Sequence, residues 1–244
     1  MPRVGSIIVA LFVAFAMPAA AECRGTVYLT IDTGSMSQAD LIARTLTEEN
    51  VKATFFLANE YTFRKDYSLD PSWDSYWKAL AQQGHAFGNH TWSHRWARRD
   101  ADNKVMVMDH KGVPDALDQK AFCEEMNRVN AAFRRATGQN LSGMWRAPGG
   151  RITQNSIRFA ASCGYPVHVH WDDAGFLGDE LSSAQYPNNV LLDRALKNTK
   201  PGDVLVMHTG IWSRKEPFAP MLKPLIQGLK ARGLCFATLG AGDR

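Results

Sequence analysis

Strand-like runs alternate with amphipathic segments along this chain of 244 residues, and this alternation limits the folds that it can adopt. Short runs rich in β-branched and aromatic residues predict strands at residues 26–31, 53–57, 85–88, 166–171, 204–207 and 235–239, with a further strand end near Met144. Apolar residues at helical spacing predict helices at residues 38–50, 72–83, 119–137, 152–163, 190–198 and 221–232. This order is typical of a parallel sheet covered by helices. Because polar residues directly follow the strands, where parallel barrels carry their active sites, we predict one α/β domain built as a parallel barrel.

Residues 95–118 interrupt the alternation. The run from Val105 to Met108 indicates one short hairpin strand, which is followed by the turn-forming residues Gly112 and Pro114. We interpret this segment as an insertion near the mouth of the site. It either shapes the choice of substrate or forms a plain surface loop.

The first 21 residues have the pattern of an export signal. Arg3 gives a positive start, an apolar run covers residues 7–17, and small residues at 19–21 are typical of a cleavage site. A membrane-spanning helix needs about 20 apolar residues, so this run is too short to anchor the chain. We therefore predict a signal peptide at residues 1–21, a mature domain at residues 22–244, no stable membrane insertion after cleavage, and a periplasmic or secreted location.

The four cysteines are expected to be paired, because exported proteins meet an oxidising environment. Four cysteines allow three pairings. We favour Cys23 with Cys235, since each lies just before a predicted strand, which leaves Cys123 with Cys163. A cysteine-based zinc cluster is disfavoured because no two of these residues are closely spaced.

The composition fits a globular protein with a full core. Hydrophobic residues make up 45% of the chain and charged residues 21%. The formal net charge of +4 is too small to indicate a nucleic-acid partner, whereas an acidic glycan or cell-wall surface remains compatible with it. The sequence gives no indication of oligomeric state.

Two histidines and several polar residues at strand ends are candidate site residues. His90 and His94 are four positions apart, and this spacing would place both imidazoles on one face of a helical turn, within reach of one cation. The alternative is a solvent-exposed helix face. Asp32, Arg146 and His208 follow predicted strands, yet each also has a structural interpretation: a turn former, an ion-pair member and a buried histidine.

Five segments in order along the chain resemble the polysaccharide deacetylases of the NodB-homology group, carbohydrate esterase family 4. They are residues 30–34, 51–57, 84–94, 146–148 and 202–208. The resemblance spans residues 26–239 and implies a distorted barrel of about seven βα units. It also implies a hydrolase that removes N-acetyl groups from an amino-sugar polymer, with a divalent metal that is commonly zinc.

The resemblance also implies a role for each site residue. His90 and His94 match the metal ligands, Asp32 the general base and His208 the general acid, which amide hydrolysis requires for the attacking water and the departing amine. Arg146 would keep Asp32 charged, and Asp173, or alternatively Asp172, would orient His208.

The backbone N–H of Gly149 would face the oxyanion. Trp92, Trp145, Trp171 and Trp212 lie beside the motifs, and each could either stack on a sugar ring or be buried.

The sequence departs from the family pattern at the third metal ligand. Thr33 stands where the family usually has a second Asp, and a neutral hydroxyl is a weaker ligand than a carboxylate. Thr33 itself, water or another carboxylate such as Asp173 could complete the site. The main prediction is therefore a metal-dependent deacetylase of peptidoglycan, a chitin-like chain or an exopolysaccharide. The alternative is a catalytically weak or inactive glycan-binding protein on the same barrel.

Overall fold

The computed structural model describes residues 23–240 as one α/β domain built on a curled sheet, so the predicted signal peptide at residues 1–21 lies outside the described residues. The strands of this sheet are β1 (Gly25–Asp32), β2 (Thr54–Leu57), β3 (Ala86–Asn89), β7 (Met144–Trp145), β8 (Val167–His168), β9 (Val204–His208) and β10 (Leu234–Ala237). Their order is β10-β1-β2-β3-β7-β8, with β9 also paired to β1. All of these pairings are parallel. The prediction of a distorted α/β barrel in a single domain is confirmed, in the form of a half-barrel.

The long strand β1 makes the sheet curl, because its two halves pair with different neighbours along one edge. Residues from Gly25 to Tyr28 pair with β10, and those from Tyr28 to Asp32 pair with β9. Across the open side, Asp172 donates its backbone N–H to the carbonyl of Val204, and its carboxylate accepts the N–H of the same residue at 2.7 Å. Loop contacts of this kind link the β8 side of the sheet to β9.

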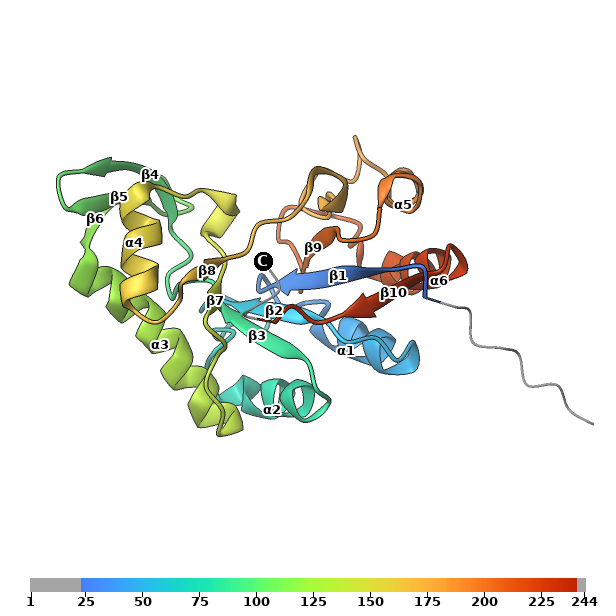
Figure 1. Cartoon of the computed structure of the whole chain (residues 1–244), viewed down its shortest axis with the longest axis horizontal. Coiled ribbons are helices and arrows are strands. Elements are labelled where there is room, and N and C mark those ends of the chain that lie inside the picture. Colours follow the sequence, from blue (N-terminus) through green and yellow to red (C-terminus); the bar gives the residue numbers. More distant parts are fainter. Residues whose placement is uncertain (1–22, 241–244) are drawn as a thin grey trace, which may run out of the picture.

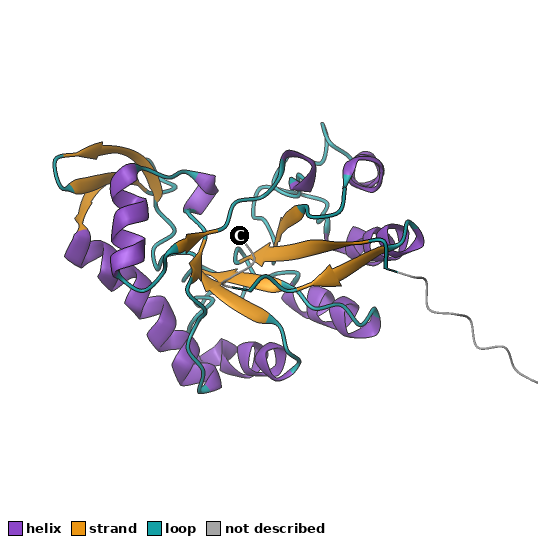
Figure 2. Ribbon diagram, in the orientation of Figure 1, coloured by secondary structure: helices purple, strands orange, loops and turns teal. Residues whose placement is uncertain are grey.

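Helices cover the outside of the sheet (Figures 1 and 2). They are α1 (Ala39–Glu48), α2 (Asp74–Gln82), α3 (Gln119–Thr137), α4 (Gln154–Ser162), α5 (Asn188–Asn198) and α6 (Leu222–Ala231), with short 3₁₀ turns η1 (Pro71–Trp73), η2 (Pro148–Gly150), η3 (Asp173–Gly175) and η4 (Ala219–Met221). All six predicted helices are present with small differences at their ends. Helix α3 has the predicted bounds, because the Asp118 carboxylate accepts the N–H of Ala121 at its start and Gly138 adopts φ = 78° at its end. None of the helices in residues 23–240 is long and apolar enough to cross a membrane.

The alternation of side chains along the strands separates two apolar clusters. In β2, Phe55 belongs to the large cluster between sheet and helices, while Phe56 belongs to a small cluster with Met144, Val169, Val204 and Leu239. This small cluster fills the inner face of the half-barrel. The side chains at the carboxyl ends of the strands lie just above this packed cluster, which supports them.

The insertion is a separate three-stranded antiparallel sheet, which stands against α3 and α4 at the upper left of Figure 1. Its strands are β4 (Trp96–Ala101), β5 (Lys104–Met108) and β6 (Pro114–Asp118). The sequence indicated only β5, since β4 is rich in charged residues and β6 begins with proline. Both are outer strands, where such residues are tolerated.

Both predicted disulfides, Cys23–Cys235 and Cys123–Cys163, are confirmed. The first joins the start of β1 to β10, and the second joins α3 to the residue after α4.

Candidate active site

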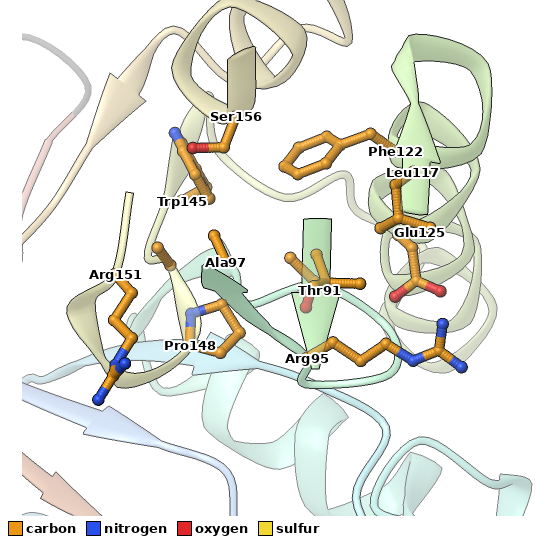
Figure 3. A pocket seen from close by; sticks show the side chains of 12 residues that line it. Thr91, Arg95, Ala97, Leu117, Phe122, Glu125, Trp145, Pro148, Arg151 and Ser156 are labelled. Atoms are coloured by element: carbon orange, nitrogen blue, oxygen red, sulfur yellow. The ribbon is translucent and has the colours of Figure 1, made fainter. Parts of the chain in front are cut away.

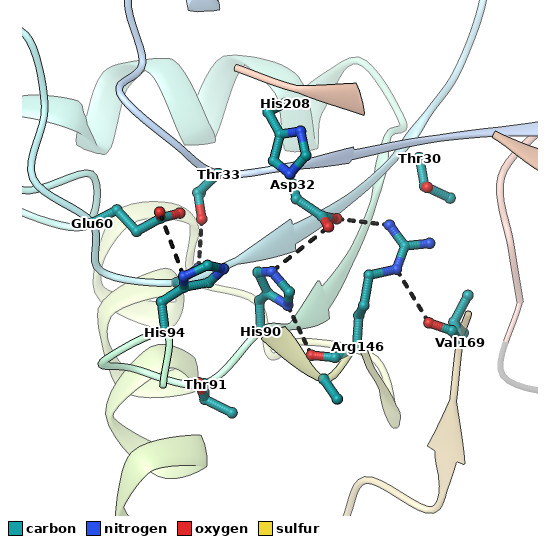
Figure 4. Close-up of polar contacts among 12 residues, drawn as sticks. Thr30, Asp32, Thr33, Glu60, His90, Thr91, His94, Arg146, Val169 and His208 are labelled. Atoms are coloured by element: carbon teal, nitrogen blue, oxygen red, sulfur yellow. Dashed lines mark hydrogen bonds and ion pairs between the residues drawn. The ribbon is translucent and has the colours of Figure 1, made fainter. Parts of the chain in front are cut away.

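A cleft with about 780 Å³ of empty space, including its open mouth, lies at the carboxyl ends of the strands. Most of the predicted site residues face it, and Figure 4 shows how their side chains converge. Its lining consists of Asp32, His90, His94, Trp96, Gly149, Arg151, Trp171, Phe176, Glu180, Val206 and His208. Asp32 and His208 end the neighbouring parallel strands β1 and β9 at the same register, so the fold brings them together. The two strands are far apart in the sequence, because Thr30 of β1 and Leu205 of β9 are separated by 175 residues.

Asp32 is a buried carboxylate held by Arg146. The guanidinium donates from Nη1 to Asp32 Oδ1 at 2.7 Å and from Nε to the carbonyl of Val169 at 3.1 Å, and it lies over the Phe56 ring. Burial alone would raise the pKa of Asp32, but the charge of Arg146, the neighbouring His90 and His208 and the hydrogen bond together lower it. Asp32 is therefore ionised at neutral pH and can accept a proton.

His208 is held by Asp179, a residue that the sequence did not indicate. The Asp179 carboxylate accepts the backbone N–H of His208 at 2.7 Å and lies 3.1 Å from Nδ1. Burial would lower the pKa of His208, but Asp179, with further help from Asp32 and Glu180, raises it to about 10. The ring is therefore protonated at neutral pH and can act as an acid.

The prediction that Asp173 orients His208 is wrong. Asp173 begins the 3₁₀ turn η3, and the alternative, Asp172, caps the amino end of β9 through Val204, at the opposite end of the strand from His208. Asp179 was missed because it lies in an irregular loop, where neither periodicity nor position after a strand marks it. The only signal in the sequence is the pair Asp179-Glu180 directly after Gly178.

His90 and His94 lie together, but not on a helical turn. The segment between them is irregular, and Thr91 and His94 adopt positive φ values of 61° and 50°. The ring centroids are nevertheless 4.8 Å apart. The expected helix is therefore wrong, while the expected proximity of the two imidazoles is correct.

The tautomer of His90 is set by its surroundings. Its Nδ1 lies 2.8 Å from the carbonyl oxygen of Arg146, which can only accept a hydrogen bond, so Nδ1 carries the proton. The lone pair is then on Nε2, which lies 3.6 Å from Asp32 Oδ2. Burial lowers the pKa of His90 to about 4, because the charge of Asp32 offsets only part of the effect of burial. The ring is therefore neutral at pH 7, as a metal ligand must be.

Glu125 of α3 supports the histidine loop from behind. Its carboxylate accepts hydrogen bonds from the backbone N–H and the hydroxyl of Ser93, both at 2.7 Å. Glu125 also lines a second, smaller hollow with about 350 Å³ of empty space, including its opening. It lies between the insertion sheet, α3 and β7 and is lined mainly by apolar side chains such as Leu117 and Phe122 (Figure 3). This hollow lies under the loop, and Arg151 lines both it and the cleft that carries Asp32 and His208.

Thr33 is buried, and its hydroxyl is already used by the backbone. Its Oγ1 accepts the N–H of Ala58 at 2.9 Å, which ties the end of β1 to the end of β2. In residues 23–240, no three His, Cys, Asp or Glu side chains converge as a closed metal site would require. Catalytic zinc sites commonly have three protein ligands and one open position; here His90 and His94 face the cleft, so water and substrate would fill the other positions around a cation. The neutral His90, which lines the cleft with its lone pair on Nε2 beside Asp32, fits that requirement.

The remaining candidates differ in their exposure. Gly149 lines the cleft with φ = 59°, and Trp171 is another lining residue. Trp145 is 1% exposed, so its interpretation as a sugar platform is wrong. Trp92 packs against the core beneath the guanidinium of Arg128. Trp212 is 64% exposed, which leaves its face open to solvent.

The sequence pattern of the family described as polysaccharide deacetylase matches residues 19–168, which is more than half of the chain. The chain belongs to the polysaccharide deacetylase family. This identifies the chain as an enzyme of the carbohydrate esterase family 4 type, and the resemblance read from its sequence is confirmed.

Relatives and solved structures agree with this family. A peptidoglycan-N-acetylglucosamine deacetylase of Bacillus cereus is 26% identical over 197 residues, which cover 80% of this chain and 76% of that protein. A family 4 carbohydrate esterase of Streptomyces lividans, solved in complex with acetate, superposes with a TM-score of 0.64 at 20% identity, covering 89% of this chain and 94% of the other. A family 4 pseudoenzyme of Bacillus anthracis has the same TM-score of 0.64 at 20% identity, covering 91% of this chain and 65% of the other. At these identities the two structures support the fold of the deacetylase family alone.

Proposed function

We propose that this chain is a metal-dependent hydrolase that removes N-acetyl groups from an amino-sugar polymer, with peptidoglycan as its first candidate substrate. The observation that carries the proposal is the pairing of a charged base with a protonated acid. Asp32 and His208 lie at matching positions on adjacent strands, and their pKa values are moved in opposite directions. Two titratable groups whose pKa values are shifted in opposite directions are typical of an acid–base catalyst.

The residues of the chain divide the work of amide hydrolysis between them. Asp32, kept ionised by Arg146, takes a proton from the attacking water. His208, kept protonated by Asp179, gives a proton to the amine nitrogen as the carbon–nitrogen bond breaks. The backbone N–H of Gly149, in the cleft lining, stabilises the negative charge on the acetyl oxygen.

A divalent cation, most simply zinc, would be held by Nε2 of His90 and by His94. When bound, such a cation supplies Lewis acidity to the amide carbonyl and to the water. Thr33 would contribute at most a weak neutral ligand, because its hydroxyl already accepts a hydrogen bond from Ala58.

The direct test is acetate release from N-acetylglucosamine oligomers and from peptidoglycan. His90→Ala removes a ligand that is held in place on both sides, so we expect acetate release to fall by at least about 100-fold, and chelator treatment of the wild type to have the same effect. Activity of the chelated protein should return when zinc is added back. Well-folded, zinc-loaded wild type that releases no acetate from any of these substrates would refute the deacetylase proposal.

An exposed group of aromatic side chains beside the cleft supports a polymer as substrate. Trp212 stacks with Tyr61 at 6.2 Å between ring centroids, and Tyr67 meets Tyr61 edge-on. All three rings are at least 47% exposed. Tyr61 follows Glu60 at the edge of the site, and Trp212 lies in the loop after β9. Flat aromatic faces of this kind suit contact with the apolar faces of sugar rings.

We therefore expect Trp212→Ala to raise KM for long oligomers by about tenfold, because one exposed aromatic contact contributes roughly 1–1.5 kcal/mol. The value of kcat should stay near that of the wild type, since Trp212 does not touch the reacting groups. Steady-state kinetics on a single sugar and on oligomers of increasing length measure this. An equal effect on all lengths would contradict the role.

The alternative, a glycan-binding protein without turnover, is favoured by one observation, the replacement of the third ligand by Thr33. It predicts saccharide binding that does not depend on metal, and no acetate. The shifted pKa values of Asp32 and His208 argue against it, because a binding protein needs neither a base nor an acid.

The relatives' activity on peptidoglycan would place the protein in the periplasm or outside the cell, as the export signal predicts.

A further inference from the structure

A carboxylate that lies outside the five segments resembling the family stands next to His94. Glu60 lies in the loop after β2, and its Oε1 is 3.8 Å from Nδ1 of His94 (Figure 4). Its second oxygen, Oε2, is buried and has no hydrogen-bond partner among the described residues. A buried carboxylate oxygen without a donor is unfavourable, so this group is poised to interact with a proton or cation at His94.

The backbone of Glu60 is fixed by hydrogen bonds that begin at Thr33. Thr33 accepts the N–H of Ala58, and the carbonyl of Ala58 accepts the hydroxyl of Ser68 at 2.6 Å. The hydroxyl of Ser68 in turn accepts the N–H of Glu60 at 3.0 Å, and the N–H of Ser68 donates to the carbonyl of Glu60 at 2.8 Å. The residue that lacks the ligand carboxylate therefore helps to hold the loop that carries another carboxylate.

The two imidazoles are oriented in the same way. Nδ1 of His90 faces the carbonyl of Arg146, and Nδ1 of His94 faces Glu60. A carbonyl only accepts hydrogen bonds, so Nδ1 of His90 carries the proton and its Nε2 keeps the lone pair, and the negative charge of Glu60, 3.8 Å from Nδ1 of His94, favours the same tautomer in that ring. Metal-binding histidines in proteins are commonly oriented by such acceptors, and a carboxylate also makes the ring a stronger ligand.

We propose that Glu60 is a positioning residue of the metal site: it accepts the Nδ1 proton of His94 and supplies, through that ring, the negative charge that Thr33 does not. The inference rests on the proposed function, because it assumes that His90 and His94 hold a cation. It accounts for how a site with a neutral residue at position 33 binds a divalent metal.

The test is zinc affinity, measured by competition with a chromophoric chelator. Glu60→Gln keeps the size of the side chain and removes its charge, so we expect the dissociation constant to rise by about 10–100-fold. Glu180→Gln is the matched control, because Glu180 faces the same cleft but contacts His208 rather than His94. It should change zinc affinity by less than about threefold.

Two further measurements separate this role from a merely structural one. Metal-free Glu60→Gln should melt at the same temperature as the metal-free wild type, while the rise in Tm on adding zinc should be smaller. Ring ¹⁵N shifts of zinc-loaded protein should show His94 protonated at Nδ1 in the wild type. Adding Thr33→Asp to Glu60→Gln should restore affinity, since it returns a carboxylate to the site.

A change in zinc affinity of less than about threefold in Glu60→Gln would overturn this inference, even if the wild type released acetate in a zinc-dependent manner. The opposite failure is distinct. If Glu60→Gln weakened zinc binding as expected but the wild type released no acetate, the role of Glu60 would stand and the deacetylase proposal would fall.

Discussion

Replacing Asp32 by Asn is expected to lower kcat by about 100- to 10,000-fold, the range that loss of a general base produces. Asn has nearly the shape of Asp and still offers an oxygen to Arg146, but it cannot take a proton from water. The value of KM should change little, because Asp32 lies at the base of the cleft and is only 2% exposed. Steady-state acetate release by the zinc-loaded variant measures both constants.

The same substitution should also destabilise the fold. The guanidinium of Arg146 is fully buried, and removal of its charged partner typically costs about 3–5 kcal/mol. The lowered pKa of Asp32 means that the ion pair stabilises the wild type above the ordinary carboxyl pKa of 3.8 and that this stability is lost as pH falls. Urea unfolding at pH 7 should therefore show a large difference that becomes smaller in acid.

Asp203→Asn is a suitable control for both effects. Its carboxylate accepts the N–H of Lys200 in the turn before β9, at the opposite end of the strand from the site. It should leave kcat unchanged. An Asp32→Asn variant that kept more than about a tenth of the wild-type kcat would exclude Asp32 as the base.

The parts of the site that the sequence predicted are those that follow a strand directly. Asp32 and His208 end β1 and β9, and Arg146 follows β7, so the parallel sheet alone brings them to one edge. Short apolar strands have a clear pattern, and the residue after each is easily located. The patterns of strand β1 and helix α3 are equally clear, so both elements were predicted nearly to the residue.

The parts that the sequence did not predict lie in irregular loops. Asp179 precedes its partner His208 by 29 residues, and Glu60 precedes His94 by more than a strand and a helix, so only the path of the loops brings each pair together. Thr91 and His94 likewise adopt positive φ values in a loop where Glu125, from a distant helix, holds Ser93, and no local pattern shows this. The sequence therefore located the proposed base and acid, whereas the groups that orient them depend on tertiary contacts.

Replacing Asp179 by Asn is expected to move the alkaline limit of activity to much lower pH. In the wild type, His208 is protonated below its raised pKa of about 10, so activity should fall only as pH rises through that value. Without the Asp179 charge, burial opposes protonation and the pKa returns towards its ordinary 6.5. At pH 8 only about 3% of the rings would then be protonated, which predicts a fall in kcat of about 30-fold.

The geometry of the loop supports this prediction. One oxygen of Asp179 accepts the backbone N–H of His208 at 2.7 Å, and Asn can keep that bond with its own oxygen. Its NH₂ group would then face Nδ1, which favours a neutral ring with the proton on Nε2. The variant should therefore fold and should regain most of its activity near pH 5.5, where His208 is again protonated.

Asp173→Asn separates this orienting role from a general loss of negative charge near the cleft. Asp173 was the residue that the sequence favoured, but it begins η3 and His208 is held by Asp179 instead. Its pH–rate profile should match that of the wild type, while the Asp179→Asn profile is displaced. NMR titration of the His208 ring gives the pKa in each protein directly. If both variants kept the wild-type profile, Asp179 would not be what holds the proton on His208, and the acid would have to be sought elsewhere in the cleft.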